Sequence, residues 1–317
     1  MIELRNLAAS DAQQLVACFR DCYGETYANE DFYNDQVIEQ MVESGRLRSV
    51  VAIHQGKLVG HTGLTIRHPE AIAAEAGNTV VSPAMRGQGL LARLGEALRR
   101  RAVREGFAGY VHYPTTAHEI MQKSATRGAG RETGIMLAYI PGETEYSDFE
   151  QSQGRLAATI VYQPLIDTPS RMSYLPTRYA QRIRSLTAAL GLNRHFLEPY
   201  APRQEASQVK DTILERRNLL HLSINKVGDD LPVRLLELAV GTQDIVHADI
   251  NLSEPGINYA IEVLSNHGFV YGGWLPNFGG NDVLRLQRID NLTEPELNPN
   301  LVTSEANALL DQIKSEF

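Results

Sequence analysis

The spacing of apolar and polar residues changes repeatedly along the first half of the chain, and these changes predict its strands and helices. Apolar runs of period two predict strands, and apolar residues three or four positions apart predict helices. We expect strands over residues 2–7, 49–54, 58–66, 77–81, 109–113, 133–140 and 156–162. Helices are expected over residues 10–22, 35–43 and 118–127, and from residue 90 onward. This order, β-α-α-β-β-β-α-β-α-β-β, indicates an α/β fold.

Local sequence signals mark several boundaries of these elements. Ser10 and Gln13 have the spacing of a capping box, which would begin the first helix. The sequence Gln55-Gly56-Lys57, between two strand patterns, predicts a hairpin. Thr303-Ser304 would cap a last helix over residues 305–314.

The second half of the chain ends with the same succession of elements as the first. Its predicted elements are a helix over residues 257–267 and strands over residues 245–251, 271–275 and 283–289. In both halves the penultimate strand closes at a proline, Pro141 or Pro276. Two interpretations stay open: a degenerate second copy of the first domain, or an unrelated α+β domain with a common helix–hairpin ending. With a linker near residues 167–170, we expect two domains, 1–167 and 168–317.

Composition and charge narrow the class of protein. The 317 residues suffice for about two domains, and a hydrophobic fraction of 43% is ordinary for a globular protein. No apolar run is long enough to span a bilayer, and the N-terminus lacks the order of a signal peptide, so we expect a cytoplasmic protein. The net charge of −8 argues against nucleic acid as a partner. Cys18 and Cys22 are too few for a zinc site, so no metal is expected.

A stretch with two glycines, between residues 80 and 98, carries the most chemical information. An apolar strand pattern stops at Pro83, Gly87 and Gly89 follow, and a helix then presents an apolar face of Leu90, Leu91, Leu94 and Leu98. Glycines let the backbone turn tightly and approach a ligand closely. The start of the helix adds unpaired N–H groups and a positive dipole end, which suit a pyrophosphate. The spacing fits neither the Rossmann motif nor a Walker A loop.

This stretch resembles the acetyl-CoA loop of the GNAT acyltransferase superfamily, whose pattern is Gln/Arg-x-x-Gly-x-Gly/Ala after a strand ending in Val-x-Pro. The sequence from Arg86 to Leu90 matches that pattern in order, and Leu91 stands where the family has glycine or alanine. The order of elements over residues 1–165 also agrees with the family. The resemblance implies a GNAT fold with a mixed α+β sheet, and a second half that is either a degenerate GNAT-like domain or an unrelated one.

The resemblance also implies where the donor would bind. The backbone of the strand ending at Val80 and Val81 would bind the pantetheine arm of acetyl-CoA. The pyrophosphate would lie on the N–H groups of Arg86, Gly87, Gln88, Gly89, Leu90 and Leu91. The arginines on the following helix (Arg93, Arg99, Arg100, Arg101 and Arg104) have two interpretations. They form a solvated helix face, or Arg93, the nearest to the loop, helps to bind the phosphates.

The family's usual proton donor, a tyrosine on the helix after the fifth strand, is absent. An ungapped match places His118 at the family's asparagine and Ala125 at its tyrosine. His118 is a candidate replacement because imidazole titrates near neutral pH and the residue follows a central strand; the alternative is a structural histidine. Glu75 is a second candidate, as a base acting through water, and its alternative is an exposed loop carboxylate. Of the neighbours His112 and Tyr113, one would face the cleft.

An aromatic segment between the first two helices would line the acceptor pocket, because the corresponding region does so in this superfamily. Tyr23, Tyr27 and Tyr33 would form its wall, with Glu25 and Glu30 attracting an amine. The alternative is a packed loop with solvated acids.

The resulting hypothesis is a cytoplasmic N-acetyltransferase that transfers an acetyl group from acetyl-CoA to a primary amine of a small-molecule or amino-acid-like acceptor. The second domain would cover the acceptor or form a homodimer. Two alternatives stay open. One is an acyltransferase that uses longer acyl-CoA or an acyl carrier protein. The other is a non-catalytic acyl-CoA-binding sensor, since the tyrosine is absent.

Overall fold

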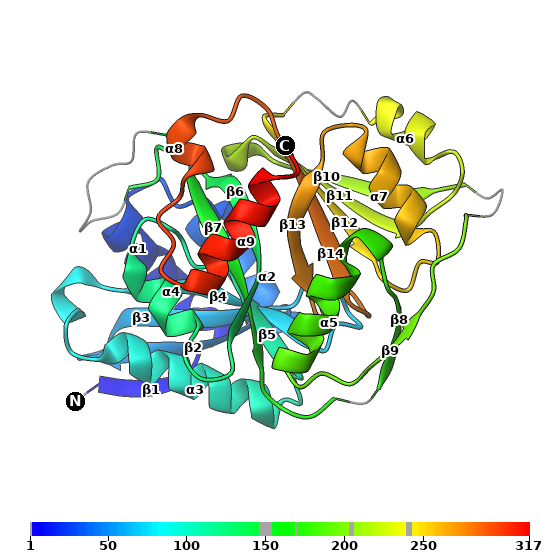
Figure 1. The fold of residues 1–317 in the computed structure, drawn as a ribbon. Coiled ribbons are helices and arrows are strands. Elements are labelled where there is room, and N and C mark those ends of the chain that lie inside the picture. Colours follow the sequence, from blue (N-terminus) through cyan, green and yellow to red (C-terminus); the bar gives the residue numbers. More distant parts are fainter. Residues whose placement is uncertain (1, 146–153, 169, 203–205, 239–242) are drawn as a thin grey trace.

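A single twelve-stranded sheet runs through the whole protein (Figure 1). The computed structural model describes residues 2–145, 154–168, 170–202, 206–238 and 243–317. Within them, the strand order of this sheet is β1-β2-β3-β4-β5-β7-β6-β13-β14-β12-β11-β10. β8 and β9 form a separate two-stranded sheet. The fold is therefore mixed α/β, as predicted.

The first half of the chain supplies seven strands at one end of this order. They are β1 (Ile2–Asn6), β2 (Leu47–His54), β3 (Lys57–Thr65), β4 (Ala73–Val81), β5 (Gly109–His112), β6 (Arg131–Ile140) and β7 (Leu156–Pro164). The helices of this half are α1 (Ala12–Tyr23), α2 (Asp35–Glu43), α3 (Leu90–Arg104) and α4 (Glu119–Ala125). β4 and β5 are parallel, whereas the other neighbours among these strands are antiparallel.

Helices cover both faces of the sheet in the first half. Leu15 and Phe19 of α1 pack with Ile38 of α2 in one buried cluster that also includes Val51 of β2. The apolar stripe of α3 packs on the opposite face, in a cluster with Ala52 of β2 and with β3 and β4. Each helix therefore buries one apolar stripe, as its periodicity predicts.

The second half adds five strands to the large sheet. They are β10 (Gln208–Leu214), β11 (Leu219–Lys226), β12 (Ile245–Asn251), β13 (Val270–Leu275) and β14 (Val283–Ile289). The small sheet is formed by β8 (Arg171–Tyr174) and β9 (Arg194–Leu197). The helices here are α5 (Ala180–Ala189), α6 (Leu231–Glu237), α7 (Ile257–Ser265), α8 (Glu294–Leu297) and α9 (Ser304–Lys314).

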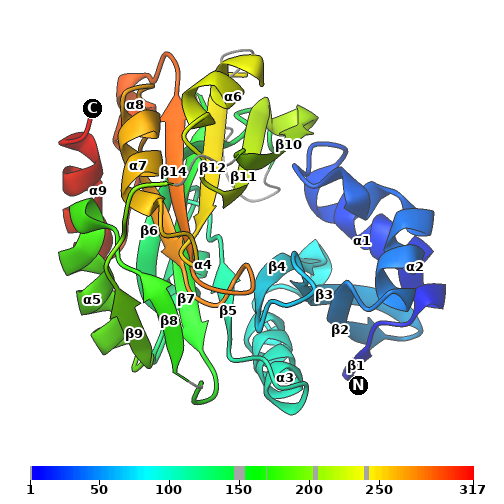
Figure 2. The same ribbon diagram turned by 90° about the vertical axis from the view of Figure 1, so that its right-hand side faces the viewer.

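The helices of the second half gather on one face of its strands (Figure 2). Ile183 of α5, Leu264 of α7 and Ile313 of α9 belong to one large buried cluster with the central strands β6, β12, β13 and β14. Residues in alternate positions of β11 and β12 point into this cluster, among them Leu222 and Ala248. Because side chains alternate across a strand, the positions between them face the other side of the sheet.

The two halves have the same pattern of strand pairings, counted from the junction between them toward each end of the sheet. From β6 the order is β7, β5 and β4, and from β13 it is β14, β12 and β11. In each series the first two pairings are antiparallel and the third is parallel. The junction itself is the antiparallel pair Gly134↔Gly273. A Cβ atom at Gly134 would lie 2.3 Å from the carbonyl oxygen of Gly272, so only glycine permits this approach.

Most predicted elements are confirmed, with some corrections at boundaries. The hairpin at Gln55-Gly56 is confirmed, and Thr303 accepts a hydrogen bond from the backbone N–H of Ala306 at the start of α9. The predicted capping box of Ser10 and Gln13 is wrong. Asp11 instead accepts hydrogen bonds from the backbone N–H of Ala8 and from Arg5, and a short 3-10 turn precedes α1.

Several elements of the second half lie outside the sequence prediction, which covered only its end. β8, β9, β10, β11 and the helices α5, α6 and α8 were not anticipated. The predicted linker at residues 167–170 includes Pro169, which lies outside the described residues, so the domain boundary stays a prediction. No helix in the described ranges is long and apolar enough to cross a bilayer.

Candidate active site

β4 and β5 pair over only four residues and then separate. The parallel pairing runs from Ala73↔Gly109 to Ala76↔His112. β4 continues to Val81 along β3, whereas the chain after β5 stays beside β7, where Thr115 bridges Ala158. The edge of β4 that faced β5 therefore loses its partner strand from Gly77 onward.

A bulge in β4 accompanies this separation. Asn78 has a φ of +52°, a conformation that asparagine tolerates better than most residues. The register of β3 with β4 shifts between His61 and Gly63 at this point. The ring Nδ1 of His61 donates to the carbonyl oxygen of Asn78 at 2.6 Å, and the Tyr27 hydroxyl donates to the Asn78 side chain at 3.0 Å. Because a bulge bends its strand, these contacts fix the divergence of β4 from β5.

The glycine loop connects the end of β4 to α3. Gly87 and Gly89 have φ values of +72° and +70°, and Gly89 is the N-cap of α3. A Cβ atom at either glycine would meet no heavy atom of the described chain within 4 Å. Arg93 is the first residue of α3 whose backbone N–H donates a hydrogen bond to the loop, to the Gly89 carbonyl at 3.2 Å. The preceding N–H groups of the first turn lack helical acceptors, as at every helix N-terminus.

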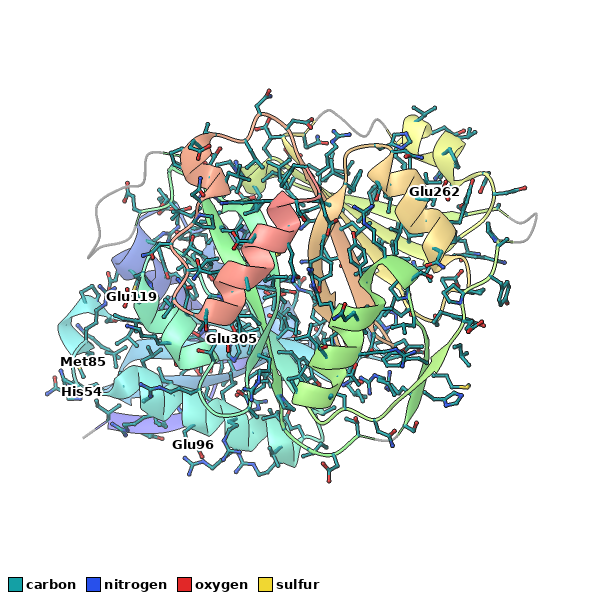
Figure 3. The ribbon with its side chains drawn as sticks, viewed as in Figure 1. His54, Met85, Glu96, Glu119, Glu262 and Glu305 are labelled. Atoms are coloured by element: carbon teal, nitrogen blue, oxygen red, sulfur yellow. The ribbon has the colours of Figure 1, made fainter. Side chains whose placement is uncertain are left out.

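The loop lies at the periphery of the molecule. Figure 3 labels Met85, which ends the short turn before the loop, near the edge of the view that also contains His54 of β2. The loop is reachable from solvent, because Gly87, Gln88 and Gly89 are exposed.

The arginines of α3 are engaged away from the loop. Arg93 donates to the carbonyl oxygen of Ile2 at 3.2 Å. Arg99 pairs with Glu96, which projects from the outer side of α3 (Figure 3), and Arg101 pairs with Glu105. This arrangement favours the solvated-face interpretation of these residues. Arg86, by contrast, turns back onto the strand and donates to the carbonyl oxygen of Val81 at 3.1 Å.

The two cysteines are buried under the end of β4. The Sγ atom of Cys18 lies 3.5 Å from the hydroxyl of Ser82, and the Sγ atom of Cys22 lies 3.5 Å from the carbonyl oxygen of Val81. Both are free thiols that pack α1 against β4.

A cavity of about 680 Å³ extends from α3 and α4 past the separated strands to the second half. On the helix side its lining includes Leu91, Gly95, Leu98, Met121, Ser124 and Ala125. At the separation it is lined by Glu75, Gly77, Asn78, His112 and Tyr113. The second half contributes residues of β10, β11, β12 and β14. Leu91 in the first turn of α3, the separated strands and the second half thus share one volume, whereas Gly87 and Gly89 are not among its lining residues.

The two predicted proton-transfer residues both line this cavity. His118 is the N-cap residue of α4, and burial lowers its pKa, partly offset by a hydrogen bond with its own backbone. Glu75 lies inside β4, which begins at Ala73 and not at Gly77 as the sequence pattern predicts. Its carboxylate accepts from Nε of Arg67 at 2.7 Å. The alternative of an exposed loop carboxylate for Glu75 is therefore wrong.

The residues at the end of β5 add further polar groups. Burial lowers the pKa of His112 to about 4, despite a hydrogen bond with the backbone of Ala76, so its ring is neutral at physiological pH. Burial also raises the pKa of Tyr113 well above its usual value. Tyr113 therefore stays protonated and offers a hydroxyl to the cavity. Both residues line the cavity, where the sequence predicts one of them.

The predicted aromatic wall is divided by the structure. Tyr23 and Tyr27 line the cavity and pack on each other with ring centroids 4.8 Å apart. Tyr33 is not among the lining residues. Its hydroxyl accepts from the backbone N–H of Tyr27 at 2.9 Å, and Arg216 of the second half lies over its ring. Tyr33 thus supports the wall and is not part of its surface.

A polar cluster on the second half was not anticipated from the sequence. Arg285 of β14 donates two hydrogen bonds of 2.7 Å to Asp249 of β12, and Nε2 of His221 on β11 lies 2.9 Å from the same carboxylate. Burial opposes the charge of Asp249, but Arg285 and then His221 outweigh it and hold its pKa well below its usual value. His247 is buried beside them and stacks on Tyr139. The polar alternation of residues 247 and 249 within a predicted strand was the available signal.

The comparisons with known proteins agree with this geometry. Residues 12–123 match the model of the acetyltransferase (GNAT) family. No curated protein matches the sequence. The cavity, the separated strands and the glycine loop all draw on this matched segment.

Several solved structures resemble about half of the chain. The ribosomal-protein-S18-alanine N-acetyltransferase of Escherichia coli is 18% identical, covers 53% of this chain and 97% of its own, and has a TM-score of 0.41. The phosphinothricin acetyltransferase of Sinorhizobium meliloti, solved with acetyl-CoA, is 19% identical and has a TM-score of 0.41. The match covers 52% of this chain and 88% of that enzyme. The PaiA N-acetyltransferase of Thermoplasma acidophilum, solved with coenzyme A, is 16% identical and has a TM-score of 0.38. The match covers 53% of this chain and 99% of that enzyme. At such scores the likenesses carry no argument of their own.

The family match begins at Ala12, the first residue of α1, and ends within α4. It includes the bulged strand β4 and the glycine loop, and it stops before the junction with the second half. Residues 12–123 of this chain therefore form a domain of the acetyltransferase (GNAT) family.

Proposed function

We propose that this protein transfers an acetyl group from acetyl-CoA to the primary amine of a small acceptor. The observation that carries the proposal is the single cavity that passes the separated strands β4 and β5 and is walled at its far end by the second half. A donor bound at the glycine loop would thus present its thioester to an acceptor within the same cavity. The cytoplasmic location and the homodimer stay predictions from the sequence.

The donor would be bound chiefly by backbone groups. The free edge of β4 after Gly77, which includes Val80 and Val81, would bind the pantetheine arm in place of β5. The pyrophosphate would lie at the N-terminus of α3, against the N–H groups between Arg86 and Leu91. The open space beside Gly87 and Gly89 leaves room for the phosphates. No metal is needed for this mode of binding.

The acceptor amine would attack the thioester carbon and lose a proton, and the CoA thiolate would leave and gain one. His118 is a candidate for taking up the proton of the amine, because its lowered pKa keeps the ring neutral at pH 7. A neutral imidazole is a weak acid, so this role differs from that of the tyrosine it would replace. Tyr113, which is protonated and lines the cavity, is one of the hydroxyl groups available to the thiolate.

The decisive experiment measures CoA binding and CoA release together. Calorimetry with CoA tests the donor site, and detection of free thiol with acetyl-CoA and a panel of primary amines tests the transfer. We expect one CoA bound per chain and thiol release that depends on an amine. CoA binding without release for any amine would instead favour the sensor, and preference for longer acyl-CoA would favour the alternative donor.

A further inference from the structure

The guanidinium group of Arg67 is fixed within the cavity but only partly used. Arg67 follows β3 and donates from Nε to Glu75 at 2.7 Å. Its side chain is 44% exposed, and it lines the cavity. The two terminal amino groups of this guanidinium have no hydrogen-bond partner among the described residues. Four N–H donors in a planar fork therefore remain available to a ligand.

The ion pair with Glu75 keeps this group in place and charged. The attraction of Glu75 raises the pKa of Arg67 above its usual value against the effect of burial. Because the carboxylate holds only the Nε side, the outer side of the fork is free to bind an acid in two-point fashion. Arg285 differs, since both its Nε and Nη2 are bonded to Asp249.

The charged side chains around Arg67 favour a ligand with one negative charge. Arg67, Arg285, Tyr113 and Tyr139 all line this cavity, and Arg217 lies over the Tyr139 ring with its Cζ atom 4.0 Å from the centroid. Arg67 pairs with Glu75 and Arg285 pairs with Asp249. Arg217 donates to the carbonyl oxygen of Tyr139 and has no carboxylate partner among the described residues. A ligand with a single negative charge would balance these charges, whereas a phosphate with nearly two would exceed the balance.

The position of Arg67 also suits an amine. Glu75, which holds it, precedes Gly77 by two residues, or about 7 Å along the strand. Gly77 marks the point where β4 leaves β5 and where the donor's thioester is expected under the proposed function. A carboxylate on Arg67 would therefore place an amine a few bonds away next to the thioester.

We propose that Arg67 is a binding residue for the carboxylate of the acceptor, and that the acceptor is an amine that carries a carboxylate, such as an amino acid. This inference rests on the proposed function for the role of the amine, but the binding of the acid is independent of turnover. The chemical class follows from the free fork of Arg67 and from the positive charge of Arg217, which no carboxylate of the described residues pairs.

The test compares three matched sets of amines on the protein saturated with CoA. The first set contains the common amino acids and β-alanine, the second their carboxamides, and the third phosphoethanolamine and aminomethylphosphonate. Calorimetry measures binding, and free thiol measured with acetyl-CoA reports turnover. We expect at least one amino acid to bind, its carboxamide to bind about 10- to 100-fold more weakly, and the phosphorylated amines to bind no better than the carboxamide.

Variants at Arg67 locate the effect. Arg67→Met should remove the preference for acid over carboxamide, and Arg67→Lys should retain part of it, because it keeps the charge but not the fork. Arg67→Met also leaves Glu75 without its partner, so the double variant Arg67→Met/Glu75→Gln guards against misfolding. Arg99→Met, on the outer side of α3, is the matched control and should bind like the wild type.

The outcomes separate this inference from the proposed function. Equal binding of acids and carboxamides, tightest binding of a phosphorylated amine, or no binding of any amino acid would overturn the role of Arg67. Turnover of amino acids that is unaffected in Arg67→Met would uphold the acetyltransferase and reject the carboxylate site. Binding of acids that depends on Arg67 without release of thiol would uphold the site and reject the catalysis.

Discussion

The two parallel strand pairs of the large sheet, β4–β5 and β11–β12, occupy corresponding places on either side of the junction. β4 and β5 pair over four residues and separate at the bulge of Asn78. β11 and β12 pair over six residues, from Leu219↔Ile245 to Ile224↔Ile250, without a register shift. Only the first pair therefore opens an edge on which an extended ligand can lie.

The segments that follow β4 and β11 differ as well. After β4 come two glycines with positive φ and the fifteen residues of α3. After β11 come Asp229 and Asp230, and α6 has seven residues. Acidic groups in the place of the glycine loop would repel a pyrophosphate. The comparison indicates that the separated pair β4–β5 of the first half suits acetyl-CoA. The continuous pair β11–β12 of the second half instead presents side chains to the cavity.

The comparison is tested most strongly at the glycine loop. We expect one CoA per chain, and Gly89→Glu should weaken CoA binding by more than about 100-fold, because a carboxylate would fill the phosphate position and repel it. Gly106→Glu is a matched control. Gly106 has a φ of +80° and equally open surroundings at the other end of α3, so it should suffer the same backbone strain and keep CoA binding. A calorimetric stoichiometry of two would show that β11–β12 also binds CoA.

Removal of His118 should have the next largest effect, on turnover alone. His118→Ala should lower kcat by about 100-fold, a typical contribution of a general base, and leave CoA affinity unchanged. Because burial lowers the pKa of His118, wild-type kcat should hold through neutral pH and fall only as the pH drops through that lowered pKa. This decrease in kcat at acidic pH should be absent in His118→Ala. Wild-type kcat in the variant would mean that the amine loses its proton to another group, such as Glu75.

Insertion of a methyl group at the junction should destabilise both halves together. Gly134→Ala would place a Cβ atom 2.3 Å from the carbonyl oxygen of Gly272 and 2.4 Å from Gly273 Cα. We expect a loss of about 3 kcal/mol in the free energy of unfolding, since backbone atoms on both sides must move. The fluorescence of Trp274, the single tryptophan and fully buried, reports the unfolding. Two separate transitions in denaturant would show that the halves are independent domains.

The smallest effect is expected on the outer face of α3. Arg93 donates to the carbonyl oxygen of Ile2, so Arg93→Met should change CoA affinity by less than about threefold through screened charge alone. Calorimetry at two salt concentrations measures this. A loss of tenfold or more would assign Arg93 to the phosphates and restore the alternative interpretation of this helix.

Much of the first half was predictable because its signals are local. The period of apolar residues located α2 at Asp35–Glu43, and Gln55-Gly56 located the hairpin. The glycine loop was recognisable because its residues are adjacent in sequence. The capping box failed because Asp11, with Arg5 and Ala8 as partners, competed for the same helix start.

The second half was predictable only in part. β12, with bounds of Ile245–Asn251, and β14, with bounds of Val283–Ile289, match their predicted ranges because apolar and polar residues alternate along both. β10 was missed because it is an exposed edge strand with Lys210 and Asp211 in its middle, so no apolar period marks it.

The sequence by itself determined the order of elements, the glycine loop and the absence of the family's tyrosine at Ala125, since each depends on neighbouring residues. Only the tertiary structure decided that Asn78 bends β4 away from β5, and that Arg67 is held by Glu75 with its fork free. It also decided that Asp249 and Arg285 of the second half face the same cavity. These relations depend on pairing and packing between segments far apart in the chain, and such contacts leave no period or motif in the sequence.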